Sequence, residues 1–198
     1  MEHYYSKHTD TQSKENLIHA NLRGKEWSFV TDAGVFSKSG VDFGTRLLLE
    51  TVQVFREDRV LDLGCGYGVI GVVLACELSE GYVVMSDINE RALSLACKNS
   101  QKYRLTNASF HSSDRFQGVP QQSFDHIITN PPIRAGKATI YKLFEEATEY
   151  LSERGSLWIV IHKKHGAESA VKKLENLYKS VEIVNKKSGY QIIRAYSG

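Results

Sequence analysis

Short apolar runs alternate along most of this chain with longer segments in which apolar residues recur every three or four positions. The short runs have the length and composition of buried strands and occupy residues 59–64, 82–87, 108–113, 124–130 and 155–162. The longer segments predict helices over residues 69–78, 89–104, 138–151 and 167–178. Two further runs, 180–187 and 189–197, are joined only through Gly189. No crossover helix fits in that connection, so we expect these two strands to pair antiparallel.

This alternation predicts an α/β protein with a seven-stranded, mostly parallel sheet, an antiparallel last strand and helices on both faces. Ahead of it, Asp42 is a plausible N-cap of a helix with an apolar stripe formed by Leu47, Leu48, Leu49, Val52 and Phe55. Residues 17–32 read as a hairpin that turns at Arg23-Gly24-Lys25, preceded by a loosely packed arm over 1–16. We expect one domain over residues 1–198, with the arm and hairpin in 1–31 and the core in 32–198.

Charge is unevenly distributed along the chain. The 198 residues carry a net charge of only +2, but residues 154–198 hold nine basic and three acidic residues. A basic C-terminal third is compatible with a nucleic-acid-binding face, and equally with a solvated, lysine-rich helix. No apolar stretch is long enough to span a membrane, and the polar N-terminus has no signal core. Three cysteines without a CxxC pair suggest a reducing, cytoplasmic location and no disulfide framework.

A glycine-rich loop follows the first core strand. The segment "DLGCGYGVIG" contains Gly66-x-Gly68-x-x-Gly71, and the next strand ends in Asp87, 23 residues after Gly64. Glycines at the carboxyl end of a parallel strand let a ligand approach the backbone. An acid at this spacing can accept hydrogen bonds from ribose hydroxyls. The pattern fits a nicotinamide dehydrogenase as well as a methyltransferase, and a simple strand-to-helix turn remains the structural alternative.

A second motif ends the fourth core strand with Asn130-Pro131-Pro132. Each proline fixes its own φ and lacks an N–H, and the residue before a proline is held extended. The resulting rim offers acceptors only, namely the Asn130 side-chain oxygen and the Pro131 carbonyl. Such acceptors suit an amine with two N–H donors, and positioning alone can carry much of the catalysis. We therefore predict that Asn130, Pro131 and Pro132 are catalytic.

Other chemistry is poorly supported by the sequence. Gly136-Lys137 is not a phosphate loop, because the required upstream glycine is replaced by Pro131 and residue 138 is alanine. His162 and His165 have no acid or cysteine nearby in sequence, so no metal site is expected. Arg134 and Lys137 could contact an RNA backbone or be ordinary solvent-exposed charges.

The string "VLDLGCGYG" resembles the first motif of class I S-adenosylmethionine-dependent methyltransferases. The resemblance implies their Rossmann-like fold and S-adenosylmethionine as cofactor. It implies that Asp62 and the Gly64–Gly68 loop hold the methionine end, that Asp87 holds the ribose and that Asp114 contacts the adenine amine. The full set of expected cofactor-binding residues is Phe36, Asp62, Gly64, Cys65, Gly66, Gly68, Asp87, Ile88, Asp114 and Asn130.

The upstream segment "FVTDAGVFSKSGVDFGTRLLLE" resembles the signature of small-subunit-type methyltransferases, a family that includes ribosomal RNA (guanine-N2-)methyltransferases. By this resemblance the loop Gly34-Val35-Phe36-Ser37, here called the GVFS loop, borders the cofactor and the target base. The expected substrate-binding residues are Ser37, Ile133, Arg134 and Lys137. Ile133 stands where methyltransferases of adenine or of protein glutamine usually have an aromatic residue. Larger bacterial members carry an additional methyltransferase-like half before this unit.

The hypothesis from sequence is methyl transfer from S-adenosylmethionine to an exocyclic amine, with guanine N2 of ribosomal RNA as the expected target. The expected partner is RNA, free or in a ribosomal particle, and the chain is expected to be a monomer or homodimer. Two alternatives stay open. One is methylation of protein glutamine or DNA adenine, and the other is a ribosome-binding assembly module that retains the fold without activity.

Overall fold

A seven-stranded sheet forms the centre of the computed structural model, which describes residues 11–132 and 135–198. Its strand order is β5-β4-β3-β6-β7-β9-β8. The strands are β3 (Arg59–Leu63), β4 (Tyr82–Asp87), β5 (Ala108–Ser112), β6 (Phe124–Thr129), β7 (Leu151–His162), β8 (Ser180–Lys187) and β9 (Tyr190–Tyr196). Only β9 runs against its neighbours, pairing antiparallel with both β7 and β8. The predicted fold class is therefore confirmed.

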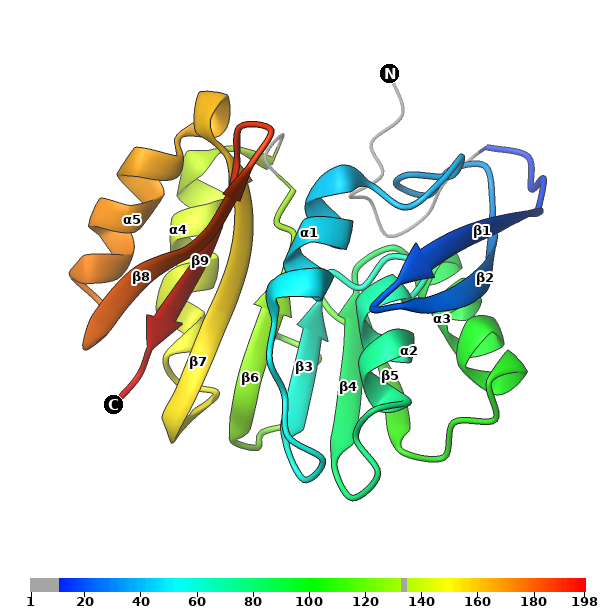
Figure 1. Ribbon diagram of the computed structural model, residues 1–198, viewed down its shortest axis with the longest axis horizontal. Helices are drawn as coiled ribbons and strands as arrows, with labels where there is room; N and C mark the ends of the chain where they lie inside the picture. The colour runs from blue at the N-terminus through cyan, green and yellow to red at the C-terminus, as the bar shows by residue number, and fades with distance from the viewer. Residues whose placement is uncertain (1–10, 133–134) are drawn as a thin grey trace.

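Helices cover both faces of the sheet (Figure 1). Helices α1 (Phe43–Thr51), α2 (Val69–Ala75) and α3 (Glu90–Lys102) pack into one apolar cluster on the first face. Helices α4 (Lys137–Ala147) and α5 (Ala167–Glu175) pack into a second cluster on the opposite face. The strands between the two clusters are nearly continuous apolar runs, because residues of both faces are buried.

The N-terminal hairpin forms a separate two-stranded sheet of β1 (Asn16–Leu22) and β2 (Lys25–Thr31), as the sequence predicts. It lies against α3, where the rings of Trp27 and Tyr103 are 4.9 Å apart. Asn99 of α3 accepts a hydrogen bond from the Val30 N–H at 2.7 Å and donates to the Val30 carbonyl at 2.9 Å. The same Asn99 amide donates to the Tyr67 carbonyl at 2.8 Å, so one side chain joins the hairpin to the glycine loop.

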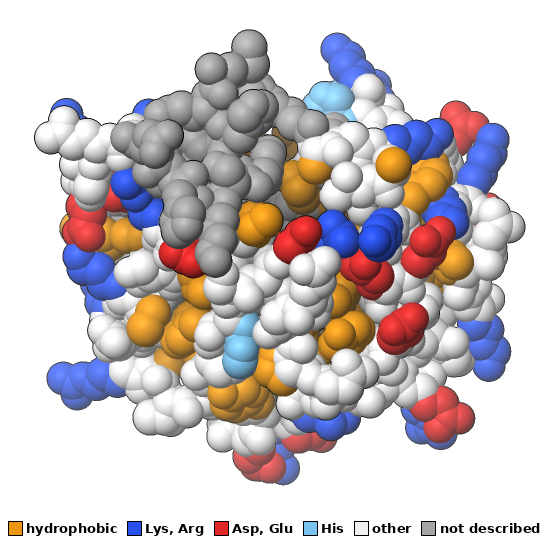
Figure 2. Space-filling view, turned by 180° about the vertical axis from the view of Figure 1, so that it is seen from behind, with side chains coloured by type: hydrophobic (Ala, Val, Ile, Leu, Met, Phe, Trp, Pro, Cys, Tyr) orange, Lys and Arg blue, Asp and Glu red, His pale blue; other side chains and the backbone are white. Residues whose placement is uncertain are grey.

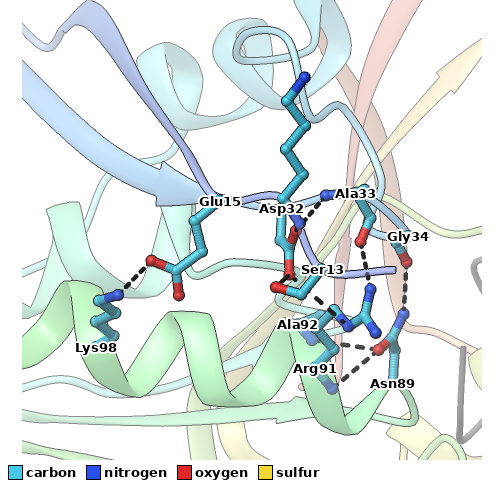
Figure 3. Close-up of polar contacts among 10 residues, drawn as sticks. Ser13, Glu15, Asp32, Ala33, Gly34, Asn89, Arg91, Ala92 and Lys98 are labelled. Carbon is cyan, nitrogen blue, oxygen red and sulfur yellow. Dashed lines mark hydrogen bonds and ion pairs between the residues drawn. The ribbon is translucent and has the colours of Figure 1, made fainter. Parts of the chain in front are cut away.

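The segment that leaves the hairpin is held by a polar cluster at the start of α3 (Figure 3). The Asp32 carboxylate accepts hydrogen bonds from Ser13 Oγ at 2.7 Å and from the Lys14 N–H, and Arg91 lies 3.8 Å away. Arg91 also donates to the Ala33 carbonyl at 2.8 Å. Glu15 pairs with Lys98 of α3, so residues 13–15 are held in place rather than loose. Residues 1–10 of the predicted arm lie outside the described residues.

Several predicted boundaries were wrong. Helix α1 ends at Thr51, because Val52 has an extended conformation, and Phe55 is 71% exposed rather than part of the apolar stripe. Helices α2 and α4 end earlier than expected, at Ala75 and Ala147. Strand β7 begins at Leu151, four residues before the predicted start, with a pairing irregularity opposite Phe124 and His126.

Candidate active site

A cavity of about 670 Å³ opens at the carboxyl ends of β3, β4 and β6, where ligands bind in open α/β sheets. Its wall is built from the glycine loop after β3, the Asp87–Asn89 turn after β4 and the Asn130-Pro131-Pro132 segment after β6. The GVFS loop and the start of α1 close another side. The structure therefore brings the two predicted motifs to one cavity.

The four glycines after β3 have two different tasks. Gly64 and Gly66 have positive φ angles of 73° and 55°, and a Cβ added to either would meet no atom within 4 Å. That open space adjoins the cavity and lets a ligand approach the backbone. Gly68 and Gly71 instead allow close packing, because a Cβ would lie 3.0 Å from Ala96 and 2.6 Å from Met85 respectively. Gly68 is thus placed away from the cavity lining.

Two carboxylates, the buried Asp62 and the half-buried Asp87, lie beside this loop. Asp62 is 1% exposed, lines the cavity and accepts a hydrogen bond from the Gly71 N–H at 2.8 Å. Burial and, to a smaller extent, the nearby charge of Asp87 raise the pKa of Asp62 to about 7, against the opposing effect of the Gly71 N–H. A buried acid with so little compensation favours a cationic ligand group, such as the ammonium of a methionine moiety.

Asp87 at the end of β4 shapes the loop as well as facing the cavity. Its oxygens accept hydrogen bonds from the Gly66 N–H and the Asn89 N–H, each at 2.8 Å. Burial raises the pKa of Asp87, and these backbone donors oppose the rise. The carboxylate has about four lone-pair sites, so at least one remains for a ligand hydroxyl beside the backbone donors Gly66, Ile88 and Asn89. The residues present thus fit S-adenosylmethionine: the Asp62 carboxylate would suit its ammonium group and the Asp87 carboxylate its ribose hydroxyls.

The remaining expected cofactor residues also line the cavity. Cys65 and Ile88 flank the two carboxylates. Asp114, after β5, is half exposed, and its Oδ1 pairs with Arg115 Nη1 at 2.9 Å. Phe36 is 44% exposed at the cavity, next to Ser37.

The side chain of Asn130 has a defined orientation. Its Nδ2 donates to Asp42 Oδ2 at 3.1 Å and to Thr45 Oγ1 at 2.9 Å. A carboxylate can only accept hydrogen bonds, so the atom of Asn130 that faces Asp42 must be the amide nitrogen. Within the described residues Oδ1 of Asn130 accepts no hydrogen bond and remains available as an acceptor in the cavity.

The other expected substrate residues are only partly at the cavity. Pro131 and Pro132 line it, and the Pro132 carbonyl accepts from the Ala135 N–H at 2.8 Å. Lys137 is the first residue of α4; its Nζ lies 5.2 Å from the Tyr141 ring, and it does not line the main cavity. Ile133 and Arg134 lie outside the described residues.

Sequence reasoning missed several residues of this site. Asp42 was predicted only as a helix cap, which it is, accepting from the Thr45 N–H at 3.1 Å. No pattern in the sequence predicts its contact with Asn130, which lies 88 positions away. His162, His165 and Tyr190 also line the cavity. No group of three metal-ligating side chains occurs within residues 11–132 and 135–198, and no helix in those ranges is long and apolar enough to cross a membrane.

The sheet order, the glycine loop and the acid after β4 together define the class I methyltransferase fold. The family model of the methyltransferase small domain matches residues 26–194. The chain therefore belongs to the methyltransferase small domain family, and it is an S-adenosylmethionine-dependent methyltransferase.

Individual relatives agree with this assignment. YbxB of Bacillus subtilis, an uncharacterized protein, is 46% identical over 98% of both chains. Ribosomal RNA large subunit methyltransferase G of Streptomyces avermitilis is 32% identical over 82% of this chain and 43% of its own length. The structure of the T. thermophilus 16S rRNA N2 G1207 methyltransferase RsmC, in complex with AdoMet and guanosine, superposes with a TM-score of 0.83 at 26% identity. It covers 93% of this chain and 51% of that one. The chain thus spans about half the length of these two methyltransferases.

Proposed function

We propose that this protein methylates an exocyclic amine in ribosomal RNA, with guanine N2 as the target. The orientation of Asn130 supports this proposal most directly, because the available Oδ1 is an acceptor suited to an N–H of a planar amine. The family supports the RNA class, since relatives over more than four fifths of this chain are ribosomal RNA methyltransferases or bind guanosine.

The reaction follows from the acceptors at the end of β6. One N–H of the amine donates to Asn130 Oδ1 and the other to the Pro131 carbonyl, which holds the nitrogen with its lone pair directed into the cavity. S-adenosylmethionine, when bound, supplies an electrophilic methyl group. The nitrogen forms the new N–C bond as the methyl–sulfur bond breaks, and the nitrogen then loses a proton to water. No strongly basic side chain is needed, because the proton leaves after the bond has formed.

The target base must leave its stack before its amine can reach the cavity in line with the methyl group. An unpaired base costs a few kcal/mol less to bring into the cavity than a base in a duplex. A base flipped out of a duplex needs that cost to be offset by binding energy. We therefore expect a guanine in a loop or junction rather than in a regular helix.

Transfer of a tritiated methyl group tests the proposal. Ribosomal RNA and ribosomal subunits from cells lacking this protein, DNA and total protein would be offered in parallel to wild type and to Asn130→Ala. Losing a preorganised hydrogen-bonding group at a reacting centre costs on the order of 100-fold or more in kcat. Asn176→Ala, at the exposed C-cap of α5, is the matched control that should keep full activity.

Label in RNA that Asn130→Ala abolishes, found as N2-methylguanosine after digestion, would support the proposal. Label found only in protein would replace it with glutamine methylation, and label only in DNA with adenine methylation. Tight S-adenosylhomocysteine binding without transfer to any of these substrates would favour a binding role in ribosome assembly.

A further inference from the structure

Two pairs of lysines meet at the carboxyl edge of the sheet, beside the cavity. Lys163 and Lys164 lie in the short helix η2 (Lys163–His165) that follows β7, and Lys186 and Lys187 end β8. All four are exposed. We call these four residues the lysine surface.

The backbone fixes the two pairs close to each other. The Lys163 N–H donates to the Gly189 carbonyl at 2.8 Å, directly before the pairing of His162 with Tyr190. Gly189 has a φ of 82°, and a Cβ there would lie 2.5 Å from His162 Nε2. The turn between β8 and β9 is therefore held against the end of β7, which keeps the lysine surface on rigid elements.

The lysine surface adjoins the proposed active site. His162 and His165, which bracket Lys163 and Lys164 in sequence, both line the cavity, as does Tyr190 in the next strand. The His162 ring lies 4.8 Å from the Tyr190 ring and 5.4 Å from the His165 ring. A polymeric ligand that enters the cavity from this side would pass these lysines first.

These charges also lack local compensation. Within the described ranges, none of the four lysines forms an ion pair, whereas Lys172 and Lys173 of α5 pair with Glu168 at 3.0 Å and with Glu145. On the described part of the face in Figure 2, basic and acidic side chains are interspersed. The lysine surface therefore places four positive charges without an ion-pair partner beside the cavity, in contrast to the two paired lysines of α5.

We propose that the lysine surface binds the phosphate backbone of the RNA next to the target nucleotide. This inference rests on the proposed function, because it assumes that RNA is the substrate. Phosphate contacts fix register and orientation without reading sequence. Four lysines on one rigid edge would hold the flanking strand while the base enters the cavity.

The test replaces all four lysines with glutamine. Each phosphate contact contributes about 0.7 to 0.9 to the slope of log affinity against log salt, so four contacts contribute about 3. We expect the slope to fall by about 3, and affinity at ~0.1 M salt to fall on the order of 100-fold. Binding of a fluorescein-labelled RNA hairpin with a loop guanine would be followed by anisotropy across salt concentrations. Methylation of ribosomal RNA would be measured in parallel, with KM expected to rise and kcat to be retained.

The matched control is Arg154→Gln with Lys179→Gln. Both residues are exposed in the same C-terminal third, but at the opposite ends of β7 and β8. This control should change neither slope nor KM. S-adenosylhomocysteine affinity should equal that of wild type in both variants, which shows that the cofactor site is intact.

The outcomes separate this inference from the proposed function. Wild-type affinity and slope in the fourfold variant, with RNA methylation intact, would overturn the lysine surface alone. Equal losses in the control variant would do the same. Lysine-dependent RNA binding without methyl transfer would support the lysine surface and refute the proposed function. If wild type neither bound nor methylated RNA, both would be overturned.

Discussion

Replacing Asp42 with alanine should slow methyl transfer far more than it weakens the fold. Asp42 Oδ2 accepts two hydrogen bonds of 3.1 Å, one from Asn130 Nδ2 and one from the Thr45 N–H. The first orients the proposed catalytic amide and the second caps α1. The substitution removes both, but the two losses appear in different measurements.

The expected magnitudes follow from these contacts. A hydrogen bond to a charged acceptor contributes about 1.5–3 kcal/mol. If that energy is what keeps Oδ1 of Asn130 directed at the substrate, kcat should fall about 10- to 100-fold, since ~1.4 kcal/mol corresponds to tenfold in rate. Loss of the N-cap costs about 1 kcal/mol of stability, which for a chain of this size lowers Tm by roughly 2–4 °C.

The assay is a double-mutant cycle with single-turnover methyl transfer as the readout. Asp42→Ala, Asn130→Ala and the double variant would be compared with wild type at saturating S-adenosylmethionine. Because Asp42 acts through Asn130, adding Asp42→Ala to the Asn130→Ala background should change kcat by less than about 2-fold. Thr45→Val, which removes the 2.9 Å hydrogen bond of a neutral partner, should give a smaller loss of about 5-fold.

Two results would refute this reasoning. An equal fall in kcat from Asp42→Ala in both backgrounds would mean that Asp42 contacts the substrate or cofactor by itself. An unchanged kcat with a lowered Tm would mean that Asp42 is only a helix cap.

Three further predictions concern the cofactor loop and its supports. S-adenosylhomocysteine should bind about tenfold tighter at pH 8 than at pH 6, because the Asp62 carboxyl, with its pKa raised to about 7, must ionise to hold the ammonium. Calorimetry on Asp62→Asn should show no such pH dependence. A pH dependence that persists in this variant would contradict the role of Asp62. Gly71→Ala should lower the free energy of unfolding by about 1–3 kcal/mol, because the added Cβ overpacks against the fully buried Met85. The expected result is a lower Tm with unchanged cofactor affinity of the folded protein. An unchanged Tm would show that Met85 moves aside. Asn99→Ala should lower the free energy of unfolding in urea by about 2–4 kcal/mol, because the part-buried backbone groups of Val30 and the buried Tyr67 carbonyl lose their partner. A loss below about 0.5 kcal/mol, the low end for one hydrogen bond, would refute that role.

Local pattern predicts the elements of this fold because the central strands β3, β4 and β6 are largely apolar runs and most helices carry an apolar stripe. It also predicts much of the site, because parallel strands end at one edge and bring Gly64, Asp87 and Asn130 together. The pattern fails at ends. Phe55 continues the apolar spacing of α1, but the chain has already turned at Val52 and leaves Phe55 exposed.

Contacts between distant segments are invisible to the same reasoning. The sequence identifies Asp42 as a cap, but its contact with Asn130 exists only because α1 begins above the end of β6. Likewise, counting lysines gives a basic C-terminal third. It does not separate Lys172 and Lys173, which form ion pairs, from Lys163 and Lys186, which lie beside the cavity without one.

Strand β8 is one of the two edge strands of the sheet and, among the described residues, pairs only with β9. Ile183 and Val184 are 37% and 42% exposed there, which is the composition of an edge that could pair with another molecule. A bulge between Ile183 and Asn185 interrupts that edge, and Lys186 and Lys187 end it with two positive charges. Both features discourage edge-to-edge aggregation. Lys186 and Lys187 therefore serve solubility as well as any ligand. Selection would act against substituting either lysine even in a cell that no longer needed the methylation.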